Sequence, residues 1–309
     1  MNKIDTIIIG DNQFFGINHM SQEKAQQLAE KFLDLKNIIR VYDIAFETGL
    51  RAVMLNSNDR AVDICNYFRE NQSKYQDINW YPSIPYPHKY ANIVAEKGIL
   101  PAVNHVLFKD NTAKNALGMM AKGGMAVLYK DAIKMMQMLI DVEMKIFKNM
   151  NIKVVFLQNI ITDLMLGYGV KEVFEEYCDY IRIKYNALPG LITQNMPYLI
   201  NKLKEWDIKE VVICTSFNKI GYLMSPNVES YVEAVNNNNP DDYQIMAMST
   251  LASGAIPAQE AFDFINKQNI QSVVFGASSR NHIKETFNLI RLNHKEGNVS
   301  VSDVFSSTM

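Results

Sequence analysis

The chain has 309 residues, of which 48% are hydrophobic and 21% are charged, and its formal net charge is −2. This is the composition of a globular protein that can bury a large core, and the lack of a basic excess argues against a nucleic-acid partner. No apolar stretch approaches the roughly 20 residues of a membrane span, so no membrane partner is expected. The short apolar run before Asp11 does not have the form of a signal peptide.

The three cysteines, Cys65, Cys178 and Cys214, lie far apart in apolar or helical contexts. Such spacing is neither a disulfide framework nor a zinc motif, and it indicates reduced thiols in a cytoplasmic protein. The histidines show no H-x-H or H-E-x-x-H spacing either. We therefore expect no metal site.

Short apolar runs, each followed by a polar turn and a helical stretch, recur along the chain. Runs without polar alternation suit strands that are buried on both faces of a parallel sheet. The expected strands are residues 6–10, 52–55, 79–83, 153–157, 190–193, 211–214, 244–248 and 272–275. Eight such strands with helices between them predict an α/β fold, a (β/α)8 TIM barrel.

The helices between these strands are bounded by capping residues and glycines. Ser21 is the expected cap of the first helix, and Gly49 is the expected stop of the second. The expected helices are residues 22–35, 41–48, 60–71, 131–148, 170–185, 196–205, 228–236, 258–267 and 281–293.

The connection between the third and fourth strands is longer than the others and predicts an extra helical insertion at about residues 89–150. Its last helix is rich in methionine, a common gap-filler in packed cores. Two interpretations stay open, namely a helix packed on the barrel and a movable lid with Gly123 and Gly124 as its hinge. Because no linker-like change of composition occurs, residues 1–309 are expected to form a single domain with a polar tail at about 296–309.

The turn between the last strand and the last helix has the composition of an anion site. Small residues let a ligand approach the backbone, and the N–H groups and dipole of a helix start favour negative charge. The expected phosphate-binding residues are Gly276, Ala277, Ser278, Ser279 and Arg280. The alternative is an ordinary corner in which Ser279 caps the helix.

Active sites of TIM barrels lie at the carboxyl ends of the strands, where this sequence is rich in carboxamides. Asn and Gln donate and accept hydrogen bonds but transfer no protons at neutral pH, so they suit a hydroxyl-rich, sugar-like ligand. The expected substrate-binding residues are Gln13, Asn18, Asn56, Gln158, Asn159, Gln194, Asn218 and Lys219.

Three residues in the loops after the first and third strands can transfer protons. His19 and His88 titrate near neutral pH, and Asp11 can orient them or accept a proton. Each also has a structural alternative: His19 can pack ahead of the helix cap, His88 can belong to a proline-rich turn, and Asp11 can bind backbone N–H groups. We take these three as the candidate catalytic residues.

The second half of the chain resembles the aldo/keto reductase superfamily in four successive pieces. The pieces are residues 190–195, 215–218, 247–254 and 276–280, the last followed by Glu285. They are similar, in order, to that family's motifs G-x-S-N, Q-x-x-Y-N and A-x-S-P-L-x-x-G, and to the corner that binds the phosphates of its nicotinamide dinucleotide. The resemblance implies a barrel fold, and it makes residues 276–280 and Glu285 the expected NAD(P)-binding residues.

The first half departs from that family at the positions that carry its chemistry. The reductases place an Asp and a Tyr after the second strand, a Lys after the third and a His after the fourth, and the Tyr protonates the carbonyl oxygen. Here Asn56 follows the second strand, Ser83 ends the third, and Gln158 follows the fourth. Carbonyl reduction by the usual route is therefore not expected.

Three hypotheses follow from the sequence. The first is a barrel enzyme, an isomerase or lyase, that acts by acid/base chemistry on a small polar metabolite, sugar-like or phosphorylated. The second is an NAD(P)H-dependent oxidoreductase with a displaced proton donor, for which Tyr86 is the nearest candidate. The third is a non-catalytic binding or assembly protein that uses its methionine-rich helices as a contact face. Whether the protein binds NAD(P) and whether it forms a homo-oligomer stay open.

Overall fold

The structure is a computed structural model that describes residues 2–15, 22–86 and 125–294. Eight parallel strands form a closed barrel, in which each strand pairs with two neighbours and β1 pairs with both β2 and β9. These strands are β1 (Ile7–Ile9), β2 (Ala52–Asn56), β3 (Asn79–Ile84), β5 (Val154–Leu157), β6 (Leu188–Thr193), β7 (Val211–Ser216), β8 (Tyr243–Met248) and β9 (Ser272–Phe275). A two-residue strand, β4 (Asn151–Ile152), pairs with the start of β3. The predicted (β/α)8 barrel is confirmed.

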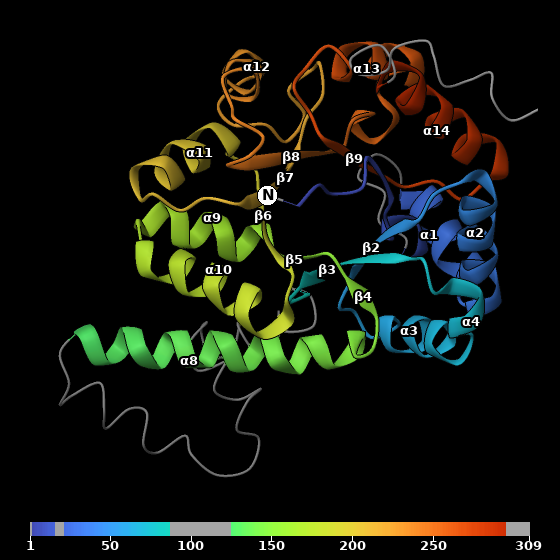
Figure 1. Cartoon of the computed structure of the whole chain (residues 1–309). Coiled ribbons are helices and arrows are strands. Elements are labelled where there is room, and N and C mark those ends of the chain that lie inside the picture. The colour runs from blue at the N-terminus through green and yellow to red at the C-terminus, as the bar shows by residue number, and fades with distance from the viewer. Residues whose placement is uncertain (1, 16–21, 87–124, 295–309) are drawn as a thin grey trace, which may run out of the picture.

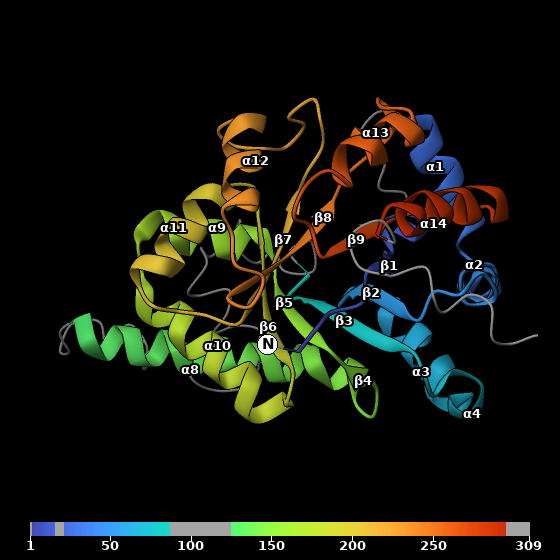
Figure 2. The same cartoon turned by 45° about the horizontal axis from the view of Figure 1, so that its top comes forward.

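The helices form an outer layer around the strands, as Figures 1 and 2 show from two directions. They are α1 (Gln22–Lys31), α2 (Leu35–Thr48), α3 (Ala61–Glu70), α4 (Gln72–Tyr75), α8 (Met125–Met144), α9 (Asn159–Tyr168), α10 (Lys171–Tyr185), α11 (Met196–Glu205), α12 (Val228–Asn236), α13 (Ala258–Ile265) and α14 (Arg280–His294). Short 3-10 helices are η1 (Asn12–Phe15), η2 (Lys145–Phe147) and η3 (Ala252–Gly254). The predicted bounds of α11 and α12 are confirmed.

Two helical predictions in the first half were wrong. The helix expected over 22–35 ends at Lys31, and α2 begins at Leu35, several residues before its expected start. The reason is Asp34, whose side chain accepts a hydrogen bond from the backbone N of Lys36 at 2.9 Å and caps α2. Gly49 ends α2 in the left-handed conformation at φ 109°, as predicted.

Two further differences concern the middle of the chain. Helix α9 was not predicted, because its ten residues are mostly apolar and offer no polar face from which a helical period could be recognised. The helix expected over 131–148 instead begins at Met125 and ends at Met144. The expected hinge at Gly123 and Gly124 and the expected tail at 296–309 lie outside the described residues.

Helix α8 lies along α10 in Figure 1, and a polar cluster joins the two helices. Asp141 of α8 accepts hydrogen bonds from the hydroxyls of Tyr180 at 2.7 Å and Tyr185 at 2.6 Å, and it also pairs with Lys184. Burial opposes ionisation of this carboxyl, but these hydrogen bonds outweigh it and lower the pKa of Asp141. The end of α8 is therefore anchored on the barrel.

Apolar side chains fill the inside of the barrel, among them Ile8, Tyr81, Phe156 and Met246. At Gly190 a Cβ atom would lie 2.3 Å from a ring carbon of Phe156, so only glycine leaves room for that ring. The interior is thus a packed core with no channel through it, and polar chemistry is confined to the ends of the barrel.

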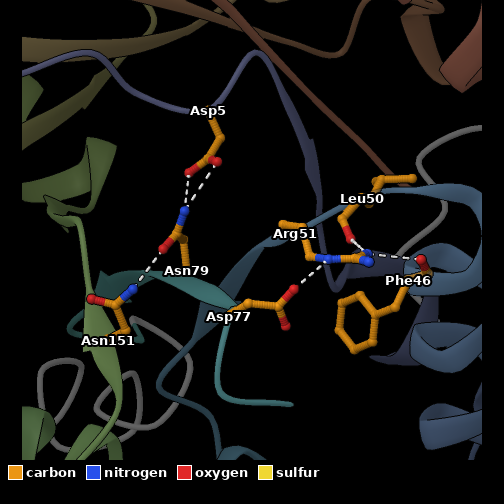
Figure 3. A network of polar contacts seen from close by, with 7 residues as sticks. All are labelled: Asp5, Phe46, Leu50, Arg51, Asp77, Asn79 and Asn151. Atoms are coloured by element: carbon orange, nitrogen blue, oxygen red, sulfur yellow. Dashed lines mark hydrogen bonds and ion pairs between the residues drawn. The ribbon is translucent and has the colours of Figure 1, made fainter. Parts of the chain in front are cut away.

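The amino end of the barrel is held by a chain of polar contacts that Figure 3 shows from close by. The carboxylate of Asp5 accepts two hydrogen bonds from Nδ2 of Asn79, at 2.9 and 3.0 Å, and one from the hydroxyl of Tyr81 at 2.6 Å. Asn79 in turn accepts a hydrogen bond from Asn151 at 2.6 Å. These contacts tie the segment before β1 to the starts of β3 and β4.

A second set of contacts at the same end is centred on Arg51, at the start of β2 (Figure 3). Its guanidinium donates to Asp77 at 2.6 Å and to the carbonyl oxygens of Phe46 and Leu50 at 2.8 and 2.6 Å. It therefore binds one carbonyl in the last turn of α2 and one just after that helix, while it pairs with Asp77, two residues before β3. Both sets of contacts are structural, so the site must be sought at the carboxyl end. Across the part of the chain that the structure describes, no helix is long and apolar enough to span a membrane.

Candidate active site

The loop after β1 places Asp11 at the carboxyl end of the barrel, where its side chain is only 3% exposed. Its two carboxylate oxygens accept hydrogen bonds from the backbone N and from Nδ2 of Asn56, both at 2.8 Å. Asn56 is the last residue of β2, so this contact joins the ends of two neighbouring strands. The structure therefore brings together two residues that were predicted separately.

Burial raises the pKa of Asp11 to about 6, although the two hydrogen bonds from Asn56 act in the opposite direction. A carboxyl group with this pKa can be protonated or ionised close to neutral pH. That property is required of a general acid or base, and it is common at active sites.

The contacts continue from Asn56 to the next strands of the barrel. Nε2 of Gln158 donates to Oδ1 of Asn56 and to the hydroxyl of Ser83, both at 2.6 Å. Ser83 lies in β3 and Gln158 directly follows β5. Four strands are thus joined by side chains alone, in the order Asp11, Asn56, Gln158, Ser83. Ser83 was not predicted as a site residue, and the only signal for it was its place where the resembled family has a Lys.

Tyr86 follows β3, and its backbone N donates to the hydroxyl of Ser57 at 3.1 Å. Burial raises the pKa of the Tyr86 phenol, and the negative charges of Asp11 and Asp59 raise it further. Tyr86 therefore lies within electrostatic range of Asp11. It is also a weaker acid than an exposed tyrosine, which bears on its expected role as proton donor.

Gln13 lies in the loop after β1, beside Gly276, the residue that follows β9. Its Nε2 donates to the carbonyl oxygen of Gly10 at 2.7 Å, and this side chain is 8% exposed. Its Oε1 is buried and, among the described residues, finds no hydrogen-bond partner. A Cβ atom at Gly276 would lie 2.6 Å from this oxygen, so Gly276 allows the amide to sit against the backbone after β9.

At the corner between β9 and α14, two of the expected phosphate ligands make other contacts. The hydroxyl of Ser279 accepts a hydrogen bond from the backbone N of His282 at 3.3 Å, which is the capping role that was the alternative. Arg280 pairs with Glu47 of α2 at 2.7 Å, and the two side chains are 47% and 58% exposed. Of the remaining predicted residues, Ala277 is buried, Ser278 is half-buried and Glu285 is exposed.

The end of β6 is shaped by Asp163, which lies in α9. Its carboxylate accepts hydrogen bonds from the hydroxyl of Thr193 and from the backbone N of Gln194, the latter at 3.0 Å. Burial raises the pKa of Asp163, although both hydrogen bonds oppose that shift. Gln194 is half-buried, and the contacts shown for it are those of its backbone. Asn159, the first residue of α9, is also half-buried.

The loop after β7 uses its amide side chain internally. Asn218 is 1% exposed, and it donates to the carbonyl oxygen of Tyr222 and accepts from the backbone N of Tyr222, both at 2.8 Å. The neighbouring Lys219 pairs with Glu260 and keeps an exposed side chain. An exposed, paired lysine is not desolvated, so Lys219 does not have the environment of a Schiff-base lysine.

Asn18, His19 and His88 lie outside the described residues, so their expected roles stay predictions. Within the three described ranges, no cluster of three or more His, Cys, Asp or Glu side chains is placed to hold a metal ion.

No protein-family model matches the sequence, and no curated protein sequence matches it. The structure is similar to that of an aldo-keto reductase from Pseudomonas aeruginosa, with a TM-score of 0.60 and 10% identity, covering 94% of this chain and 92% of that one. An aldo-keto reductase of the silkworm Bombyx mori gives a TM-score of 0.56 and 9% identity, over 93% of this chain and 79% of that one. An aldo-keto reductase from a Medee basin deep-sea metagenome library gives a TM-score of 0.53 and 9% identity, covering 97% of this chain and 94% of that one.

Proposed function

Because this chain has the barrel fold of the aldo-keto reductases, we propose that it is an NAD(P)H-dependent oxidoreductase that reduces a small, sugar-like carbonyl compound. The observation that carries the proposal is the Asp11 carboxyl group, buried at the carboxyl end of the barrel with a pKa raised to about 6. Reduction of a carbonyl requires a proton donor at the oxygen, and Asp11 is suited to supply it near neutral pH. The isomerase or lyase hypothesis, placed first from the sequence, finds no support in the structures that resemble this chain.

The corner after β9 fits a dinucleotide in three features. Helix α14 has 15 residues and presents its amino end there, which favours a phosphate. Gly276 is exposed, so a ligand can approach the backbone there without meeting a side chain. Arg280 would exchange Glu47 for the phosphate, and since a surface ion pair contributes at most about 1 kcal/mol, that exchange is inexpensive. When bound, the cofactor would supply the hydride.

The proton donor in this proposal is Asp11, and Tyr86 has a different role. The pKa of Tyr86 is raised by burial and by Asp11 and Asp59, so its phenol holds its proton more tightly than an exposed tyrosine. We assign it to orienting the substrate oxygen through a hydrogen bond. This differs from the sequence-based expectation that Tyr86 itself is the displaced donor. The amides of Asn56 and Gln158 hold Asp11 in place.

The experiment is titration of the purified protein with NADPH and NADH by fluorescence and calorimetry, with Asp11→Asn and Arg280→Ala in parallel. We expect micromolar binding that is retained in Asp11→Asn and weakened in Arg280→Ala. Reduction of sugar-like carbonyl compounds should be lost in Asp11→Asn alone. Absence of binding by either nucleotide would refute the oxidoreductase proposal.

One observation favours a second candidate, cofactor-free proton transfer within a sugar. The positions that carry Asp, Lys and His in the reductases are occupied here by Asn56, Ser83 and Gln158, which can bind hydroxyls, and among the described residues Asp11 is the proton-transfer group joined to them. Exchange of substrate hydrogen for deuterium in D2O without nucleotide, followed by NMR, would support this candidate. Its loss in Asp11→Asn would identify the base.

A further inference from the structure

The contacts among Asp11, Asn56, Gln158 and Ser83 have a direction. Asn56 gives its Nδ2 hydrogen to Asp11 and receives a hydrogen from Gln158 on its Oδ1. Gln158 uses the same Nε2 atom for Asn56 and for Ser83, at 2.6 Å each. Every amide in this series therefore donates toward β1, and the series ends on the carboxylate of Asp11.

An asparagine side chain can exchange its oxygen and nitrogen by rotating half a turn, and only its partners decide between the two arrangements. In one arrangement Asn56 offers an N–H group to Asp11. In the other it offers an oxygen, which repels a carboxylate. The backbone N of Asn56 donates to Asp11 in both cases. Of the two hydrogen bonds from Asn56 to Asp11, only the one donated by Nδ2 therefore depends on Gln158.

The contacts of the Gln158 amide favour one orientation of the Asn56 amide over the other. Gln158 is 8% exposed and Ser83 is 1% exposed, so water has little access to the Nε2 end of the Gln158 amide, which lies between Asn56 and Ser83. A reversed Gln158 would set its oxygen against the oxygen of Asn56, and Asn56 would then have to turn its own oxygen toward Asp11. Reversal of either amide would therefore remove the side-chain hydrogen bond that the Asp11 carboxylate accepts.

Among the described residues, the titratable groups that face Asp11 from neighbouring elements are Tyr42 of α2 and Tyr86 after β3, with Asp59 acting on Tyr86. Burial raises the pKa of both tyrosines, and the charge of Asp11 adds to each shift. Both phenols therefore stay neutral around pH 6. A change in the titration of Asp11 on replacement of Gln158 would not be a secondary effect of these two groups.

We propose that Gln158 and Asn56 are positioning residues, in which Gln158 fixes the direction of the Asn56 amide and thereby keeps a hydrogen-bond donor on Asp11. The geometric proposal stands without any assumption about the reaction. Its catalytic meaning, control of the pH at which Asp11 is a proton donor, rests on the proposed function.

The test is the titration of the Asp11 side-chain carboxyl, followed by carbon-13 NMR in protein without nucleotide or substrate and assigned by its disappearance in Asp11→Asn. In Gln158→Leu the hydrogen-bond donor to Asn56 is lost. The pH at the midpoint of the Asp11 titration should then rise by about one pH unit. In Gln158→Glu an ionised carboxylate would draw Nδ2 of Asn56 away from Asp11, and the midpoint should rise further. Gln158→His restores an N–H donor and should return the midpoint toward that of the wild type.

Gln194→Leu is the matched control, because it removes an amide at the same end of the barrel from a strand outside the series. It should leave the midpoint of Asp11 unchanged. Circular dichroism and urea unfolding establish that each variant is folded, and Gln158→Glu, for which a raised midpoint is expected, keeps the test decisive if Gln158→Leu does not fold. An unchanged midpoint in Gln158→Leu and Gln158→Glu would overturn the proposal.

The same experiment separates this proposal from the proposed function. If neither nucleotide binds but the midpoint moves as expected, the positioning series stands and the oxidoreductase proposal falls. If the nucleotides bind and the midpoint of the Asp11 titration does not move, the oxidoreductase proposal stands and the positioning series falls. Where reduction is measurable, the pH profile of kcat/KM should shift in parallel with the midpoint in Gln158→Leu.

Discussion

The two halves of the barrel's carboxyl end carry similar polar side chains and use them differently. In the first half, side chains bond to one another across strands, from Asp11 through Asn56 to Gln158. In the second half, side-chain contacts between strand ends are single pairs, such as Ser216 with Ser249 at 3.2 Å, and the Asn218 amide bonds mainly to the backbone of Tyr222 in its own loop. Carboxamides at strand ends therefore do not by themselves distinguish a binding site from a stabilised loop. What sets the first half apart is that its amides form one series that ends on a buried carboxyl group.

The half of the chain that resembles the aldo/keto reductases in sequence is not the half that contains the series of contacts ending on Asp11. The second half resembles the aldo/keto reductases in sequence, yet there Ser279 caps α14 and Arg280 pairs with Glu47. The first half departs from them at the expected catalytic positions and nevertheless contains Asp11 with its raised pKa. The resembling pieces therefore accompany the barrel fold, whereas the described group suited to proton transfer lies in the half that departs from the family's pattern.

The largest effect should come from removing the proton-transfer group of the first half. Asp11→Asn should lower kcat/KM by roughly 10²-fold to 10⁴-fold, the range that a general acid contributes. Steady-state kinetics with the substrate found in the nucleotide screen would measure it, and circular dichroism would check the fold. Activity within tenfold of the wild type would assign the proton donor to another residue.

The burial of Asp11 should also make stability depend on pH. Its pKa is about 6 in the folded protein against 3.8 as a model value, so the folded state binds the proton more tightly than the unfolded state. Stability from this group is then full below pH 4 and falls as the pH rises from about 4 to about 6. The loss should reach roughly 3 kcal/mol, at about 1.4 kcal/mol per pKa unit.

Urea unfolding of the wild type and Asp11→Asn between pH 4 and pH 8 would measure this dependence. The difference in unfolding free energy between the two proteins should change with pH by the stated amount. A constant difference over that range would show that Asp11 is not desolvated as the structure indicates.

In the second half, Asn218→Ala should destabilise without affecting Asp11. The variant leaves the backbone groups of Tyr222 without their partner, at a cost of about 1–3 kcal/mol in unfolding free energy. Urea unfolding would measure the loss, and the Asp11 midpoint should stay where it is in the wild type. Movement of that midpoint would mean that the two halves are coupled.

The smallest effect is expected for the surface pair at the corner after β9. Glu47→Gln removes the carboxylate that pairs with Arg280 and should change the unfolding free energy by less than about 1 kcal/mol. Calorimetric titration should show equal or tighter nucleotide binding, because Arg280 becomes available to the phosphate. Weaker binding in this variant would place the phosphate elsewhere.

The regular parts of the fold could be predicted because they depend on neighbours within a few residues. Buried apolar runs indicated the strands, the bounds of α11 and α12 were recovered, and Gly49 ends α2 as expected, whereas Ser279 takes the capping role that was the alternative to phosphate binding. The start of α2 was missed because the cap formed by Asp34 outweighed the pattern of the following residues. Helix α9 was missed because an apolar segment has no polar face to reveal its period.

The site itself depended on register, which no local pattern contains. Asn56 stands beside Ser83 in the pairing of β2 with β3, and Ile84 stands beside Leu157 in the pairing of β3 with β5. These pairings bring Gln158 to Asn56 across 102 positions of sequence, and the contact of Asp11 with Asn56 spans 45. Sequence supplied polar residues for every strand end, but only closure of the barrel decided which of them meet, because hydrogen bonds form between neighbours in space.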